Sequence, residues 1–72
     1  MPDKNLLKAV GTKIKQIRAE KQMSQNKLAD LCNFEKASMS RIESGQTNTT
    51  LLTLRKISAA LDIHISELLK EA

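Results

Sequence analysis

The stretch Ser24–Gly45 constrains the fold of this chain more than any other part of the sequence. Its apolar residues recur three or four positions apart in two separate sets, and mostly polar residues fill the positions between them. This spacing puts the apolar side chains on one face of an α-helix. The two sets are Leu28, Ala29 and Cys32, then Met39 and Ile42. The stretch therefore predicts two short helices joined by a tight turn, each with one buried face.

The ends of these two helices can be placed from residues that favour helix termini. Ser24 is a strong N-cap residue, and Asn33 tolerates the left-handed conformation in which many helices end. We expect the second helix of the pair to occupy about Glu35–Ser44 and to stop at Gly45. Phe34 then lies within the turn, where its side chain fills the core.

The rest of the chain continues the helical pattern, and no segment alternates apolar and polar residues as a half-buried β-strand would. Further helices are expected at Asn5–Lys21, Leu51–Leu61 and Ile65–Glu71, with Thr50 as the cap of the second of these. The chain has one Phe and no Trp or Tyr, so its core must be aliphatic. We therefore expect one all-α, five-helix domain spanning residues 1–72, with the two-helix motif at residues 24–45.

Side chains expected to face the core are spaced along the outer three helices as well. They are Leu7, Val10, Ile14 and Ile17 in the first helix, Leu51, Leu54, Ile57, Ala60 and Leu61 in the fourth, and Leu68 in the last. Gly11 lies at the edge of the first stripe, where the absence of a side chain permits close packing against a neighbour. Residues Met1–Lys4 and Ala72 are expected to be loosely held.

Several classes of protein are disfavoured by what the sequence lacks. One Cys and one His cannot form an internal disulfide or a zinc site, which predicts a reducing, cytoplasmic setting and no metal or other cofactor. No apolar run is long enough to cross a membrane, and no phosphate loop, paired carboxylate or nucleophile motif suggests an enzyme or a small-molecule ligand. Cys32 is expected as a small core residue, and His64 as a structural or surface residue.

The net charge is +4, and its distribution along the chain is uneven. Residues 1–22 contain six basic and two acidic residues, whereas residues 23–72 contain six of each. The whole excess therefore lies in the first segment. It indicates either a polyanionic partner such as nucleic acid or simply a solvated helix face, and the sequence leaves both interpretations open.

The helix expected at Glu35–Ser44 has two unlike sides. At about 100° per residue, Met39 and Ile42 fall on one side, and small or basic residues fall on the other. The second group is Lys36, Ala37, Ser40, Arg41 and Ser44. A helix with small side chains fits the major groove of DNA, and Lys36 and Arg41 are long donors that can reach O6 and N7 of guanine. Two short helices of this kind are typical of a DNA-binding helix-turn-helix.

The start of the preceding helix is a candidate phosphate site. Free backbone N–H groups at a helix N-terminus attract anions, and Ser24 and Gln25 are placed to add hydrogen bonds there. Lys27 lies in the first turn, where a positive charge opposes the helix dipole at a cost of about 0.3–1 kcal/mol. Either a phosphate lies beside Lys27 or the lysine is merely tolerated on the surface, and we favour the phosphate.

Two charged residues lie at the edges of apolar faces. Arg18 borders the apolar stripe of the first helix, and Glu43 borders the buried side of the Glu35–Ser44 helix. A half-buried charge needs an opposite charge beside it, so we expect these two residues to form an ion pair.

Four stretches of the sequence carry a resemblance to a known family. They are S-Q-x-x-L-A at Ser24–Ala29, M-S-R-I-E-S-G at Met39–Gly45, L-x-T-L-x-K-I-x-x-A-L at Leu51–Leu61 and E-L-L at Glu67–Leu69. Together they resemble the Cro/phage-repressor-type (XRE-like) helix-turn-helix family over roughly residues 6–70. The short chain is most similar to stand-alone members, which include the controller proteins of restriction–modification systems.

The resemblance implies a five-helix, lambda-repressor-like domain that binds a pseudo-palindromic DNA operator as a two-fold dimer. It implies base contacts from the positions that match Lys36, Ala37, Ser40 and Arg41. It also implies phosphate contacts from Gln25, Ser44 and the loop near Asn48, and it supports the pairing of Arg18 with Glu43.

Apolar residues on the outer side of the last two helices need to be covered. They are Leu52, Ala59, Ile65 and Leu69. A second copy of the chain is the simplest partner, since a two-fold dimer places two recognition helices about one DNA turn apart. Our leading hypothesis is a sequence-specific DNA-binding transcriptional regulator that acts as a homodimer. The alternatives are an antitoxin-type protein-interaction module that also binds its own promoter, and a non-specific nucleic-acid-binding protein.

Overall fold

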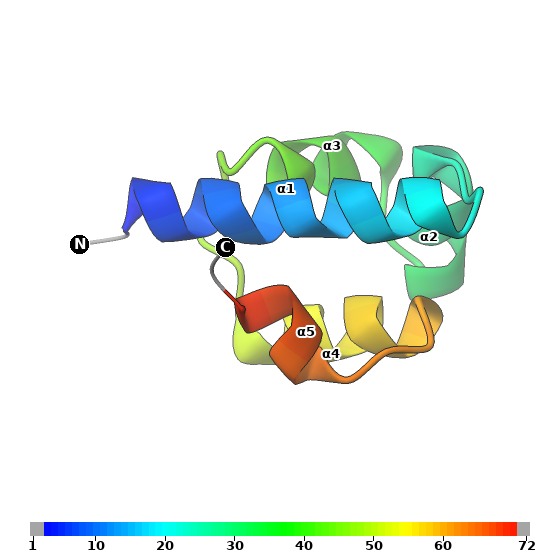
Figure 1. The fold of residues 1–72 in the computed structure, drawn as a ribbon. Coiled ribbons are helices and arrows are strands. Elements are labelled where there is room, and N and C mark those ends of the chain that lie inside the picture. The colour runs from blue at the N-terminus through cyan, green and yellow to red at the C-terminus, as the bar shows by residue number, and fades with distance from the viewer. Residues whose placement is uncertain (1–2, 71–72) are drawn as a thin grey trace.

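The computed structural model describes residues 3–70, which form five α-helices and no strand. The helices are α1 (Lys4–Glu20), α2 (Gln25–Cys32), α3 (Lys36–Glu43), α4 (Leu51–Ala60) and α5 (Ile65–Leu69). The predicted all-α, five-helix architecture is confirmed. In Figure 1, α1 runs across the molecule, with α3 on one side of it and α4 and α5 on the other.

The core is aliphatic, as the composition requires, and every helix contributes to it. Each helix supplies at least one side chain with less than 2% exposure; these are Ile14, Leu28, Met39, Ile57 and Leu68. Burial of one such side chain stabilises the fold by about 1.5–3 kcal/mol. Phe34 packs against the same core from the turn between α2 and α3, as predicted.

Four of the five helices, α1 to α4, end in the same way. A residue with left-handed backbone ends the helix, and the N–H of the next residue donates to a carbonyl five positions earlier, which is the Schellman arrangement. The left-handed residues are Gln22, Asn33, Gly45 and Asp62. Asn33 and Gly45 are the predicted helix ends. Left-handed backbone at Gln22 is not expected from the sequence, because glutamine has no local preference for it.

The first helix begins one residue earlier than expected, because Asp3 caps it. Oδ1 of Asp3 accepts hydrogen bonds from the backbone N–H groups of Asn5 and Leu6 at 3.0 and 3.1 Å. These bonds satisfy two of the donors that a helix N-terminus leaves free. The expectation of a loosely held start is therefore wrong for Asp3 and Lys4, and residues 1–2 lie outside the described part.

Two expectations about the last two helices are also wrong. Leu51 does not face the core but is 67% exposed, because it is the first residue of α4 and lies at the edge of the buried stripe. The fifth helix ends at Leu69 instead of Glu71, since the backbone at Lys70 is extended, with φ −71° and ψ 126°. Glu71 and Ala72 lie outside the described residues.

Candidate nucleic-acid interface

The exposed side of α3 carries the small and basic residues that the helical pattern predicts there. Met39 and Ile42 point into the core and are 0% and 6% exposed. The opposite side is formed by Lys36, Ala37, Ser40, Arg41 and, at the helix end, Ser44, all of them exposed. Within residues 3–70, neither Lys36 nor Arg41 forms an ion pair. The helix therefore presents a narrow surface with two long, positively charged side chains that are available to a ligand.

Ser44 lies at the C-terminal end of this surface, and Asn48 lies beyond it. Ser44 caps α3, and its Oγ donates to the backbone carbonyl of Arg41 at 3.1 Å. Asn48 is exposed in the loop between α3 and α4. Both residues line a groove of about 600 Å³ between that loop and the start of α1. The two positions expected to contact phosphate thus share one surface beside the exposed side of α3.

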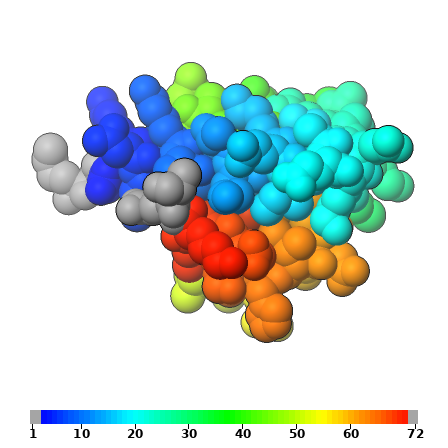
Figure 2. All heavy atoms as spheres, in the orientation of Figure 1, coloured from blue at the N-terminus to red at the C-terminus, as the bar shows by residue number. Residues whose placement is uncertain are grey.

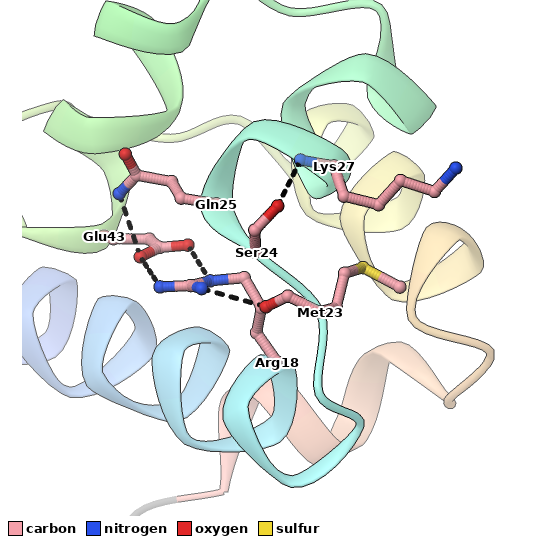
Figure 3. Close-up of polar contacts among 6 residues, drawn as sticks. All are labelled: Arg18, Met23, Ser24, Gln25, Lys27 and Glu43. Carbon is pink, nitrogen blue, oxygen red and sulfur yellow. Dashed lines mark hydrogen bonds and ion pairs between the residues drawn. The ribbon is translucent and has the colours of Figure 1, made fainter.

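The N-terminus of α2 is capped as the sequence predicts. Oγ of Ser24 accepts a hydrogen bond from the backbone N–H of Lys27 at 3.0 Å (Figure 3). Within the described part of the chain, the N–H groups of Gln25 and Asn26 make no hydrogen bond, as is usual in a first helical turn. The exposed side chain of Lys27 extends away from the cap. Free donors and a positive charge therefore lie together at this helix end.

The side chain of Gln25 makes a contact that sequence reasoning missed. Its Nε2 donates to Oε1 of Glu43 at 3.1 Å, so the amide is held inside the protein (Figure 3). The backbone N–H of Gln25, in contrast, makes no hydrogen bond within residues 3–70. Nothing in the sequence signals the contact, because the two residues are 18 positions apart and lie on different helices.

Arg18 and Glu43 form the ion pair that their places on the helices suggest. Nε of Arg18 lies 2.9 Å from Oε2 of Glu43, and Nη2 lies 3.0 Å from Oε1. The third donor of Arg18, Nη1, reaches the backbone carbonyl of Met23 at 3.0 Å, just before α2 begins. Figure 3 shows these contacts converging from α1, α2 and α3. The network ties the start of α2 and the end of α3 to α1, which fixes the angle between the two helices of the motif.

Close backbone packing at Gly11 places α3 against α1. A Cβ atom at Gly11 would lie 2.3 Å from the carbonyl oxygen of Glu43 and 2.8 Å from that of Ile42, which is too close for any side chain. The close packing expected at Gly11 is therefore present. It brings the C-terminal end of α3 directly against the middle of α1.

Comparison with known proteins identifies the family of this chain. A family model described as helix-turn-helix matches residues 14–68. The chain belongs to this helix-turn-helix family. The control protein C.MunI of Mycoplasma sp is 40% identical over 62 residues, which cover 85% of this helix-turn-helix chain and 84% of that protein.

Two solved structures are similar to this helix-turn-helix protein. The restriction-modification controller protein C.AhdI from Aeromonas hydrophila has a TM-score of 0.83 and 34% identity, covering 86% of this chain and 94% of that one. The biofilm regulator SinR, solved in complex with DNA, has a TM-score of 0.77 and 40% identity, covering 85% of this chain and 98% of that one. The match spans 57% of the length of SinR from Bacillus subtilis (strain 168).

In this protein, the outer surface of α4 and α5 carries the apolar residues expected there. Leu52 and Leu69 are 77% and 45% exposed, Ala59 is exposed, and Ile65 is half-buried against the core. Ala59 and Ile65 line a groove of about 890 Å³ that also has charged walls. Leu52 and Leu69 do not line it, so the structure brings two of the four residues together.

Residues 3–70 contain neither a candidate metal cluster nor a helix that could span a membrane. No group of three or more His, Cys, Asp or Glu side chains in that part of the chain could hold a metal ion. None of its helices has both the length and the apolar character that a membrane span requires. Cys32 is a buried core residue, and His64 is exposed just before α5.

Proposed function

We propose that this DNA-binding transcriptional regulator acts as a homodimer, with α3 of each protomer in the major groove of a pseudo-palindromic, double-stranded operator. The observation that carries the proposal is the exposed side of α3, where Lys36 and Arg41 accompany the small side chains of Ala37 and Ser40. The similarity to SinR, which was solved in complex with DNA, and to the controller protein C.AhdI supports it.

In this proposal, base recognition depends on four side chains. Lys36 and Arg41 donate to O6 and N7 of guanine, which is the commonest specific contact in the major groove. Ser40 can donate to or accept from a base edge, and the methyl group of Ala37 packs against the C5-methyl group of thymine. Because α3 is short and its central side chains are small, its backbone can approach the base edges closely.

Phosphate contacts hold the reading helix in register but carry no sequence information. We assign them to the start of α2, where Ser24, Gln25 and Lys27 surround free N–H groups, and to Ser44 and Asn48 beyond the end of α3. Gln25 contacts Glu43, the last residue of α3, so both sets lie near the C-terminal end of the exposed side of α3. In the proposal, phosphate contacts at this end hold α3 in register in the groove.

The dimer is proposed through the outer surface of α4 and α5. Leu52 is 77% exposed, and Ala59 and Ile65 line a groove on the same two helices, so apolar surface is left for a partner to bury. A second copy of the chain covers this surface and supplies the second recognition helix that a pseudo-palindromic operator requires.

The test begins with selection of bound DNA from a random duplex pool, which yields the half-site and its spacing. Lys36→Ala and Arg41→Ala should each weaken binding to the selected operator by about 1–3 kcal/mol and relax the preference at one base pair. Lys13→Ala is the matched control, because Lys13 lies on α1 outside the surfaces described above and should leave the preference unchanged. Unchanged operator affinity in both α3 variants would refute the assignment of the base-reading side.

The dimer surface has its own test. Ala59→Glu should shift the protein toward monomer in sedimentation equilibrium, since it buries a charge in the proposed contact. Ala19→Glu is the control, because Ala19 is also an exposed alanine but lies on α1. Monomeric wild type at micromolar concentration, with or without operator, would contradict the homodimer. Stoichiometric co-purification of a different protein would favour the antitoxin-type alternative.

A further inference from the structure

A groove separates the start of α1 from the loop between α3 and α4. Its volume is about 600 Å³, and it is lined by Lys4, Leu7, Lys8, Ser44, Gly45, Gln46 and Asn48. Figure 1 shows that loop lying alongside the N-terminal half of α1. In Figure 2 the atoms of the two segments meet on the surface. The groove thus joins two segments about 40 residues apart in the chain.

The spacing of the groove walls is fixed by a close backbone contact. A Cβ atom at Gly45 would lie 2.8 Å from Cγ and 2.9 Å from Cα and N of Lys8. Gly45 also has a φ of +76°, which glycine adopts without strain. The loop therefore lies directly against α1 at Lys8, and this contact holds the lysine beside the polar residues of the loop.

The groove is positively charged, and nothing in the described chain neutralises it. Lys4 and Lys8 are exposed, and within residues 3–70 neither forms an ion pair. Among the described residues, no acidic side chain lines the groove, while Gln46 and Asn48 add amide donors on the opposite wall. This combination suits an anion with several oxygen atoms along an extended path.

We propose that this groove binds a DNA sugar–phosphate backbone adjoining the half-site that α3 reads. The proposal rests on the proposed function, because the groove is continuous with the candidate interface through Ser44, which belongs to both. Lys4 and Lys8 each neutralise one phosphate, and Gln46 and Asn48 donate to phosphate oxygens from the other wall. The footprint of each protomer then extends beyond the base pairs that its recognition helix touches.

The test is the salt dependence of DNA binding. Fluorescence anisotropy titrations of a selected operator duplex, and of a scrambled duplex, are carried out between about 50 and 200 mM salt. For the double variant Lys4→Gln/Lys8→Gln, the slope of log K against log salt concentration should fall by about 1.8 per bound protomer, since each phosphate contact contributes about 0.9. The base preference should not change, because phosphate contacts carry none.

Lys13→Gln is the control on the same helix: it removes one positive charge, against two in the double variant, about 180° around α1 from Lys4. Its slope should equal that of wild type after allowance for the lost net charge. Methylphosphonate substitution of the flanking phosphates gives a second measurement, and should weaken wild type but not the double variant. Circular dichroism spectra check that both variants remain folded.

The proposal would be overturned if the double variant had the same salt slope as Lys13→Gln and if methylphosphonates weakened its binding as much as that of wild type. The proposed function fails separately, if wild type binds operator and scrambled duplexes equally. In that case the slopes on either duplex still decide whether the groove contacts the backbone. A wild-type protein that binds no duplex would overturn both.

Discussion

Arg18 and Glu43, 25 residues apart in the chain, are joined by two charge-assisted hydrogen bonds of 2.9 and 3.0 Å between α1 and α3. The Glu43 side chain is only 1% exposed and that of Arg18 is 18% exposed. Within residues 3–70, no buried side-chain nitrogen or oxygen lacks a hydrogen-bond partner. Any other placement of the two helices would leave a charge unpaired in the interior, so the pair specifies their arrangement more than it adds stability.

Removing the side chain of Arg18 or Glu43 alone should therefore destabilise the fold more than replacing both. Glu43→Ala leaves the Arg18 guanidinium partly buried without a counter-charge, and should lower the free energy of unfolding by about 3–5 kcal/mol. Arg18→Met combined with Glu43→Leu replaces the pair with apolar groups of similar size, and should recover part of that loss. Recovery is incomplete because the Met23 carbonyl and the Gln25 amide each lose a hydrogen-bond partner. Urea denaturation measures the free energy of unfolding of the single and the double variant. An equal loss of stability in the two would contradict this account.

The contact at Gly11 gives a second stability prediction. Gly11→Ala puts a methyl group 2.3 Å from the backbone carbonyl oxygen of Glu43. This oxygen cannot rotate away as a side chain could, so the whole of α3 must shift. We expect a loss of about 1–3 kcal/mol in thermal or urea unfolding, as for other overpacked sites. Thr12→Ala, at the next and exposed position of α1, is the control and should be neutral or slightly stabilising. If Gly11→Ala changed the stability as little as Thr12→Ala, α1 and α3 would not be held in close contact.

The sequence predicts those parts of the fold that depend on local pattern. Apolar spacing places the core faces of all five helices, because burial is the dominant force in so small a chain. Ser24 and Thr50 cap their helices through their own side chains, which is chemistry confined to one turn. The ion pair between Arg18 and Glu43 is also accessible, since two charges at the edges of buried faces require each other.

Other features depend on packing between distant segments and could not be predicted in this way. The amide of Gln25 is drawn to Glu43 only because α2 and α3 meet at that point. Gln22 has left-handed backbone, for which glutamine has no local preference, and the next residue, Met23, packs against the core. The groove between α1 and the loop after α3 exists because Gly45 lies against Lys8, a contact between separate parts of the chain.

Cys32 yields a pH-dependent prediction. Burial raises the pKa of its thiol above the ordinary value, an effect only partly opposed by the nearby positive charge of Lys56. Because the folded pKa exceeds the unfolded one, this contribution is fully present below the unfolded pKa and is lost as pH rises through the folded pKa. Unfolding free energy should therefore fall more steeply above about pH 9 in wild type than in Cys32→Ala.

Alkylation measures the same property of Cys32 directly. The thiolate is the reactive form, so iodoacetamide should react much more slowly with the native chain than with the urea-unfolded chain at the same pH. Equal rates would mean that the thiol is neither buried nor perturbed. The Sγ atom also lies 3.8 Å from the backbone carbonyl of Lys56, a contact that alkylation would break.

Substitution of Lys27 can distinguish a phosphate contact from a lysine that is merely tolerated on the surface. It lies in the first turn of α2, which contains no acidic residue, so Lys27→Gln should raise the free energy of unfolding by about 0.3–1 kcal/mol. Lys21→Gln is the control of opposite sign, because Lys21 caps the C-terminal end of α1, where a positive charge is favourable. If Lys27 contacts a phosphate, its substitution should also weaken operator binding and reduce the salt slope by about 0.9 per protomer. A more stable variant with unchanged binding would mean that the lysine is only tolerated on the surface.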